Sequence, residues 1–219
     1  MSKQNVFIKF ILDAIAIILR GSQLYHTWVL ILISLISLGV YAYTKQFNEG
    51  FIVTGMNDLV SWGLYISNFT FLVGVAAAAV MLVLPAYVLK DVDFSKAVLI
   101  CEGLAVAAII MCLCFVTADL GRPDRFWHLI PFLGHFNWPQ SMLAWDILVL
   151  NGYLVLNLSI PFYILFSHYL GRTPNKKLYV PFVFLSVFWA FGIHLVTAFL
   201  YAGFPSRHFW HTSLLGPRF

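Results

Sequence analysis

Charged residues are scarce in this sequence. Lys and Arg number 13 and Asp and Glu number 9, so only 10% of the 219 residues are charged, against about a quarter in an ordinary soluble domain. Apolar residues make up 61% of the chain, and phenylalanine alone occurs 21 times. This composition excludes a soluble globular, a disordered or a disulfide-stapled protein, and it indicates a membrane protein with several spans.

Cysteines and basic runs are few as well. The three cysteines, Cys101, Cys112 and Cys114, lie in one apolar stretch, where neighbouring positions point to different sides of a helix. We therefore expect small core residues rather than a disulfide or a metal clip. The longest basic run is Lys176-Lys177, which gives no reason to expect nucleic acid as a partner.

The histidines are too scattered to form a haem or metal site. A b-type haem with two histidine ligands needs imidazoles that face each other at matching depth on different spans. Only His194 lies deep in a predicted span, and the sequence contains neither a CxxC nor an HxxxH motif. We predict no haem and no metal site.

Hydropathy predicts an all-α fold, a polytopic transmembrane helix bundle with about five transmembrane helices. Each apolar segment has the 20 or so residues needed to cross about 30 Å of hydrocarbon, and a helix is expected because lipid offers the backbone no other hydrogen-bond partner. Pro85 lies in the overlong second segment, where it predicts a tilt, a kink or an early exit from the bilayer. The predicted spans are Leu24–Tyr43, Val60–Leu89, Ala97–Thr117, Met142–Ser167 and Tyr179–Phe204.

A shorter apolar segment, Val6–Leu19, precedes the first span. It is too short to cross comfortably, and Lys9, Asp13 and Arg20 follow one helical stripe, which favours an N-terminal helix lying in the membrane interface. A signal peptide is the competing interpretation, although an Asp within the apolar run and the absence of a clear cleavage site argue against it. The sequence thus divides into an interfacial helix over 1–23 and a transmembrane bundle over 24–219.

The distribution of Lys and Arg predicts the orientation. Eight of the 13 lie before the first span or in the loops on the same side, and five lie on the other side. Positive charge concentrates in cytoplasmic loops. We therefore predict a multi-pass protein of the cytoplasmic membrane, with its N-terminus in the cytoplasm.

Polar side chains gather in the outer half of the predicted bundle. At 1.5 Å per helical residue, Asp146 lies about 6 Å below the outer surface, Tyr65 about 8 Å, Asn68 about 12 Å and His194 about 15 Å, while Asp119 caps the outer end of the third span. A charged group in hydrocarbon costs at least about 2.5 kcal/mol, so Asp146 must face protein or water. Each of these residues can be functional, or can simply hold helices together through hydrogen bonds.

The outer loop between the third and fourth spans carries its own charges. Its Pro, Gly and aromatic content predicts a structured, partly re-entrant segment anchored at the interface by tryptophans. Arg122, Asp124 and Arg125 in this loop are compatible with solvated charges, with an internal salt bridge or with docking of a partner.

Several stretches resemble the polysulfide reductase NrfD family of membrane subunits. They are GLYISNFTFLVGVAAAAV in the second span, ADLGRPDRFWHLIP and SMLAWDILVLNGYL around the outer loop, and the C-terminal GIHLVTAFLYAGFPSRHFWHTSLLGPRF. The match covers nearly all five spans. It looks most like the DsrP type, from the sulfite-reduction-associated Dsr complex, with the HmcC type as an open alternative.

The resemblance implies a haem-free subunit that exchanges electrons between menaquinone or another quinone and a periplasmic iron-sulfur subunit. A multihaem cytochrome c and other membrane subunits of a Dsr-type complex are further implied partners. In the family, the acid of the tryptophan-aspartate motif serves the quinone or proton site, which makes Asp146 the expected catalytic residue. Expected quinone-binding residues are Tyr65, Asn68, His194, Asp119 and Arg122.

Family members have about twice as many spans, in two bundles, so we expect this chain to represent the N-terminal half of such a subunit or a split subunit. The sequence thus predicts a quinone-interacting subunit of a respiratory oxidoreductase complex, in which the quinone carries the redox chemistry. Two alternatives remain open, a structural membrane anchor and an ion- or proton-translocating subunit without quinone chemistry of its own.

Overall fold

The structure is a computed structural model that describes residues 3–57, 59–60, 62–84, 92–203, 208 and 210–218. Its described part is helical and contains no strand. The elements are α1 (Lys3–Leu19), α2 (Gln23–Glu49), η1 (Phe51–Val53), α3 (Leu64–Leu84), α4 (Val92–Asp119), η3 (Pro123–Leu129), α5 (Met142–Tyr169), α6 (Lys176–Ala202) and α7 (Leu215–Arg218).

The predicted polytopic helical fold is confirmed. Four helices, α2, α4, α5 and α6, are long and apolar enough to cross a membrane, and α3 is a shorter apolar helix. The second predicted span begins later than expected, at Leu64 rather than Val60, because the Asn57 carboxamide accepts hydrogen bonds from the backbone N–H groups of Leu59 and Val60 and holds a turn there. Its predicted C-terminal part, with Pro85 and Leu89, lies outside the described residues.

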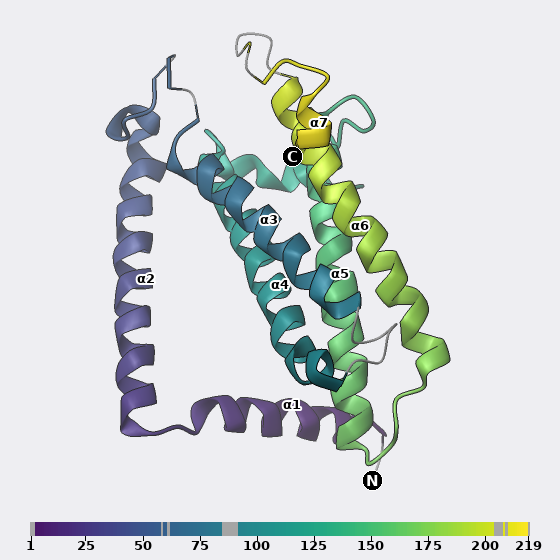
Figure 1. Cartoon of the computed structure of the whole chain (residues 1–219). Coiled ribbons are helices and arrows are strands. Elements are labelled where there is room, and N and C mark those ends of the chain that lie inside the picture. The colour runs from purple at the N-terminus through teal and green to yellow at the C-terminus, as the bar shows by residue number, and fades with distance from the viewer. Residues whose placement is uncertain are drawn as a thin grey trace. The chain divides into compact units, whose positions relative to one another are not determined.

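The chain divides into two compact units, and the first contains residues 1–55 with 165–173. Ser22 caps the start of α2, and α1 runs crosswise to α2 (Figure 1). The ring of Phe10 on α1 lies 5.3 Å from that of Phe166, and the Tyr169 hydroxyl donates a 2.7 Å hydrogen bond to Asp13. This bond explains how an acid fits within an apolar helix. The interfacial position of α1 stays a prediction.

The second unit, residues 56–164 and 174–219, contains the bundle of α3, α4, α5 and α6. Buried residues on three of its helices follow alternating steps of four and three, the repeat of left-handed helix packing. Neighbouring helices run antiparallel (Figure 1). The buried positions that follow this repeat are 98, 102, 105, 109, 112 and 116 on α4, 146, 150, 153, 157, 160 and 164 on α5, and 179, 183, 186, 190, 193 and 197 on α6.

A glycine lets the Trp189 side chain of α6 approach the α5 backbone closely. A Cβ atom on Gly152 would lie 2.4 Å from Cζ2 of Trp189, so the indole occupies the space that a side chain at this position would fill. The Trp189 Nε1–H donates a 2.7 Å hydrogen bond to the Val149 carbonyl one turn earlier on α5. This contact fixes the register of the two helices on which the candidate site is built.

Candidate functional site

Asp146 lies at the centre of the bundle, near the end at which α3 and α5 begin and α4 and α6 end, called here the η3 end. It lies near the start of α5, and its side chain is 0% exposed. Thr197 Oγ1 of α6 donates a 3.1 Å hydrogen bond to Asp146 Oδ1. Within the described part of the chain, Asp146 Oδ2 has no hydrogen-bond partner. The acid is thus held by one bond and keeps a second oxygen as an acceptor.

Other helices also bury polar groups towards this end of the bundle. The Cys112 thiol of α4 donates a 3.7 Å hydrogen bond to the Phe69 carbonyl of α3, and Tyr201 of α6 is only 5% exposed. The Tyr201 hydroxyl is hydrogen-bonded to Thr70 Oγ1 on α3. All four helices therefore contribute a polar side chain within about two turns of the η3 end.

An aromatic group covers the site at this end. The ring of Tyr201 lies 5.2 Å from that of Trp62 and 5.7 Å from that of Trp210, and the two indoles stack at 5.4 Å. Trp62 comes from the segment that precedes α3, and Trp210 comes from the segment that follows α6. They close the bundle over the polar residues by apolar contact.

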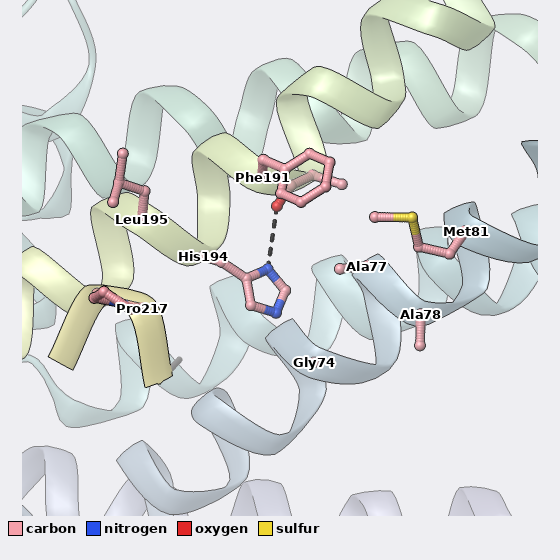
Figure 2. Close-up of a pocket in the computed structure, with 10 residues that line it drawn as sticks. Gly74, Ala77, Ala78, Met81, Phe191, His194, Leu195 and Pro217 are labelled. Atoms are coloured by element: carbon pink, nitrogen blue, oxygen red, sulfur yellow. Dashed lines mark hydrogen bonds between the residues drawn. The ribbon is translucent and has the colours of Figure 1, made fainter. Parts of the chain in front are cut away.

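A cavity of about 560 Å³ opens between α3, α6 and α7. Figure 2 shows the His194 imidazole between α6 and the small residues of α3. His194 Nδ1 lies 3.1 Å from the Ala190 carbonyl. A carbonyl only accepts, so Nδ1 donates this bond, and a neutral ring in this tautomer has Nε2 as its acceptor. The lining is Gly74, Ala77, Ala78, Met81, Ala190, Phe191, His194, Leu195, Gly216 and Pro217.

Asp146 and His194 are linked through α6. Thr197, which bonds Asp146, is three residues beyond His194 and so lies close to the same helix face. Ala190, one turn before His194, belongs both to the cavity lining and to the buried core. The acid itself is enclosed by the bundle, while the imidazole lines the cavity.

Two other predicted binding residues lie on the first turns of α3. Asn68 Nδ2 donates a 2.9 Å hydrogen bond to the Leu64 carbonyl of its own helix. The ring of Tyr65 lies 6.3 Å from that of Phe115 on α4. Both side chains are half-buried, and their role in binding stays a prediction.

Asp119 and Arg122 take different positions at the η3 end. Asp119 is the last residue of α4, and its Oδ1 is buried with no hydrogen-bond partner among the described residues. Arg122 points to solvent with 67% of its side chain exposed, and its Nε and Nη2 bond Asp124 at 3.0 and 2.9 Å. This pair lowers the pKa of Asp124, chiefly through the hydrogen bond from Arg122, and raises that of Arg122.

Sequence reasoning selected Asp146 but missed the hydroxyl groups of Thr197, Tyr201 and Thr70 at the same end of the bundle. Thr197, Tyr201 and Thr70 were not selected, although Thr197 and Tyr201 are four residues apart in the last span and so share one helix face. That spacing beside a histidine was the available signal. Among the described residues, no three His, Cys, Asp or Glu side chains gather closely enough to hold a metal ion.

The helices and the buried polar centre define a multi-pass α-helical membrane protein. The family model described as "Polysulphide reductase, NrfD" matches residues 52–219, and the chain belongs to this family. It is 27% identical over 155 residues to the C subunit of the selenate reductase of Mesobacillus selenatarsenatis, covering 71% of this chain and 35% of that protein. It is 26% identical over 207 residues to a candidate membrane subunit, also termed C, of a dimethyl sulfoxide reductase of Halobacterium salinarum, covering 88% and 47%.

The chain therefore spans about a third to a half of the length of these relatives. Both are named as subunits of reductases, and one of them as a membrane subunit. The similarity to the family extends over α3 to α7 and thus includes every residue of the site.

Proposed function

We propose that this chain is the quinone-interacting membrane subunit of a reductase complex, which exchanges electrons between the menaquinone pool and a periplasmic iron-sulfur subunit. One observation carries the proposal. Asp146 is a fully buried acid held by a hydrogen bond from Thr197, and Thr197 lies three residues after His194, which lines the cavity. Membership of the NrfD family supports the same function.

The cavity suits a quinone ring. Ligand pockets usually enclose about 300–1,000 Å³ and combine apolar walls with a few polar groups, and this cavity has both features. Gly74, Ala77 and Ala78 leave room for a flat ring against the α3 backbone. His194 Nε2, the acceptor of the neutral imidazole, binds a quinol hydroxyl and orients the ring.

The protein's part in the reaction is the handling of protons. A bound quinol supplies two electrons and two protons as it is oxidised to quinone, and the electrons pass to the iron-sulfur partner. His194 positions the hydroxyl, Asp146, with Oδ1 fixed by Thr197, accepts one of the two protons on Oδ2, and the second proton leaves to solvent. In quinone reduction the same groups act in the reverse direction.

Orientation and partners complete the proposal. The excess of Lys and Arg on the N-terminal side supports an orientation with the η3 end at the outer face, where in this proposal the iron-sulfur subunit docks. The relatives are named for selenate and dimethyl sulfoxide, so the DsrP type, its link to sulfite reduction and a multihaem cytochrome c partner rest on the resemblance of the sequence motifs alone.

The test is quinol-dependent electron transfer by the purified complex that contains this chain. Asp146→Asn keeps the size of the side chain but cannot take a proton, and we expect it to assemble normally and to lose most of the turnover. Glu102→Gln is the matched control, a buried acid of α4 towards the opposite end of the bundle, and its effect should be smaller. Full turnover of Asp146→Asn would refute the role of the acid.

The wild-type complex separates the alternatives. A complex that assembles but shows no quinol-dependent electron transfer, even with short-chain quinol analogues, would support a structural anchor or an ion-translocating subunit instead.

A further inference from the structure

Helix α1 leaves a stripe of large apolar side chains exposed. Its members recur at steps of four and three residues, so they share one face of the helix. Each of them is 47–68% exposed, and together they are called here the apolar stripe. They are Ile8, Leu12, Ile15 and Leu19. Such a stripe suits the acyl chains of lipid, because an interfacial helix buries its apolar face at the boundary of head groups and chains.

A charged stripe runs beside the apolar one. Lys9, Asp13 and Arg20 each directly follow a member of the apolar stripe, so they lie about 100° further round the helix. Asp13 is held by the Tyr169 hydroxyl at 2.7 Å. Lys9 and Arg20 are exposed, and within the described part of the chain their side chains have no hydrogen bond or ion pair. The charged stripe thus carries two unpaired cations and one acid that is already engaged.

Side chains of α2 fix the corner between α1 and α2. The Tyr25 hydroxyl donates a 2.8 Å hydrogen bond to the Ile18 carbonyl, and Nε2 of His26 lies 3.3 Å from the Leu19 carbonyl. Both carbonyls belong to the last turn of α1, where the backbone has no acceptor partner within its own helix. These contacts hold α1 crosswise to α2 (Figure 1).

This corner determines where the two stripes lie in a membrane. Because α2 is long and apolar enough to cross a bilayer, a helix held crosswise at its end lies along the membrane surface. The apolar stripe can then enter the acyl-chain region while the long side chains of Lys9 and Arg20 reach the head groups. The family match begins at residue 52, so no role for α1 follows from the family.

We propose that α1 binds anionic phospholipids, with its apolar stripe among the acyl chains and with Lys9 and Arg20 on the head-group phosphates. The two cations lie about 16–17 Å apart along the helix, so they contact different lipids. With one engaged acid between them, the stripe keeps a net positive charge, which complements an anionic head group better than a zwitterionic one. The proposal does not depend on quinone chemistry, so its failure would leave the proposed function untouched.

The experiment identifies the lipids that touch the apolar stripe. Leu12→benzoylphenylalanine places a photo-crosslinker on this stripe, and the complex that contains the chain is reconstituted in vesicles of equal parts phosphatidylglycerol and phosphatidylcholine. After illumination, mass spectrometry counts the adducts of each lipid. The test variant adds Lys9→Gln and Arg20→Gln. The matched control adds Lys45→Gln, which removes an exposed cation towards the other end of α2.

We expect phosphatidylglycerol adducts to exceed phosphatidylcholine adducts at least about fivefold when both cations are present, because one basic residue near a membrane surface favours anionic lipid by about this factor. In the variant without Lys9 and Arg20 the ratio should fall to within about twofold of one. Lys45→Gln should leave the excess unchanged. Salt at about 1 M should lower the excess, since it screens charges beyond about 3 Å.

Three results would overturn the proposal. A ratio near one with both cations present would mean that α1 contacts lipid without preference for charge. Crosslinks to protein in place of lipid would mean that the apolar stripe packs against a partner subunit. An excess that survives the loss of Lys9 and Arg20 would mean that other groups select the lipid. Should the variant without both cations fail to assemble, the salt series decides, and an excess that about 1 M salt does not reduce would refute the proposal.

Discussion

The hydrogen bond from Thr197 to Asp146 joins α6 to α5, and Thr197→Val tests its contribution. Valine has nearly the shape of threonine but cannot donate, so the change removes the bond and little packing. Thr197 is fully buried, so we expect no water to replace the lost donor. The carboxyl of Asp146 is then left without a hydrogen-bond donor among the described residues.

The size of the effect follows from the environment. Hydrogen bonds between helices in membranes contribute about 0.6 kcal/mol on average and at most about 1.7 kcal/mol. A bond to an ionised group contributes more, about 1.5–3 kcal/mol. A double-mutant cycle with Asp146→Ala should therefore give a coupling energy of about 0.6–1.7 kcal/mol for a neutral acid and about 1.5–3 kcal/mol for an ionised one.

The assay is reversible unfolding in mixed micelles, with the free energy of unfolding measured for each single and double variant. Ser186→Ala serves as the control for Thr197→Val. Ser186 is a buried hydroxyl on the same helix, but it bonds the Val183 carbonyl of α6 itself, so its cycle with Asp146→Ala should show no coupling. A coupling energy between Thr197 and Asp146 within about 0.3 kcal/mol of zero would refute the reasoning.

Three further predictions concern packing, topology and cofactor content. Gly152→Ala should lower the free energy of unfolding by about 1–3 kcal/mol, because its Cβ would overlap the Trp189 indole. Gly103→Ala is the control and should be tolerated, because a Cβ atom there would meet no atom within 4 Å. Equal effects of the two changes would contradict the close approach of the indole to Gly152. In Phe132→Cys the new thiol replaces a side chain that is 103% exposed, and it should react with a membrane-impermeant thiol reagent in intact cells. In Thr173→Cys the thiol should react only after the cells are permeabilised. The opposite pattern would reverse the predicted orientation. The chain purified without other subunits should show no reduced α band in its absorption spectrum, since His194 is the one histidine that lies deep in a predicted span. Such a band would make a haem ligand of it.

Much of the fold could be predicted from the sequence because hydropathy is a local property. Twenty consecutive apolar residues must form a helix in lipid whatever surrounds them, so the spans and the fold class followed directly. The same logic selected Asp146, since an acid within such a span must face protein. The later start of α3 could not be predicted this way, because the turn at Asn57 depends on one side chain and not on mean hydropathy.

The contacts between helices were decided only by the tertiary structure. In a soluble bundle the apolar stripe of a helix marks its inner face, but in a membrane the lipid-facing side is apolar too. The interior positions of α5, such as Leu150 and Tyr153, therefore do not stand out from the lipid-facing Val155 in the sequence. Which hydroxyl meets Asp146 depends on the rotation and register of α6 against α5. That register depends on contacts such as Trp189 over Gly152, which join residues far apart in the chain.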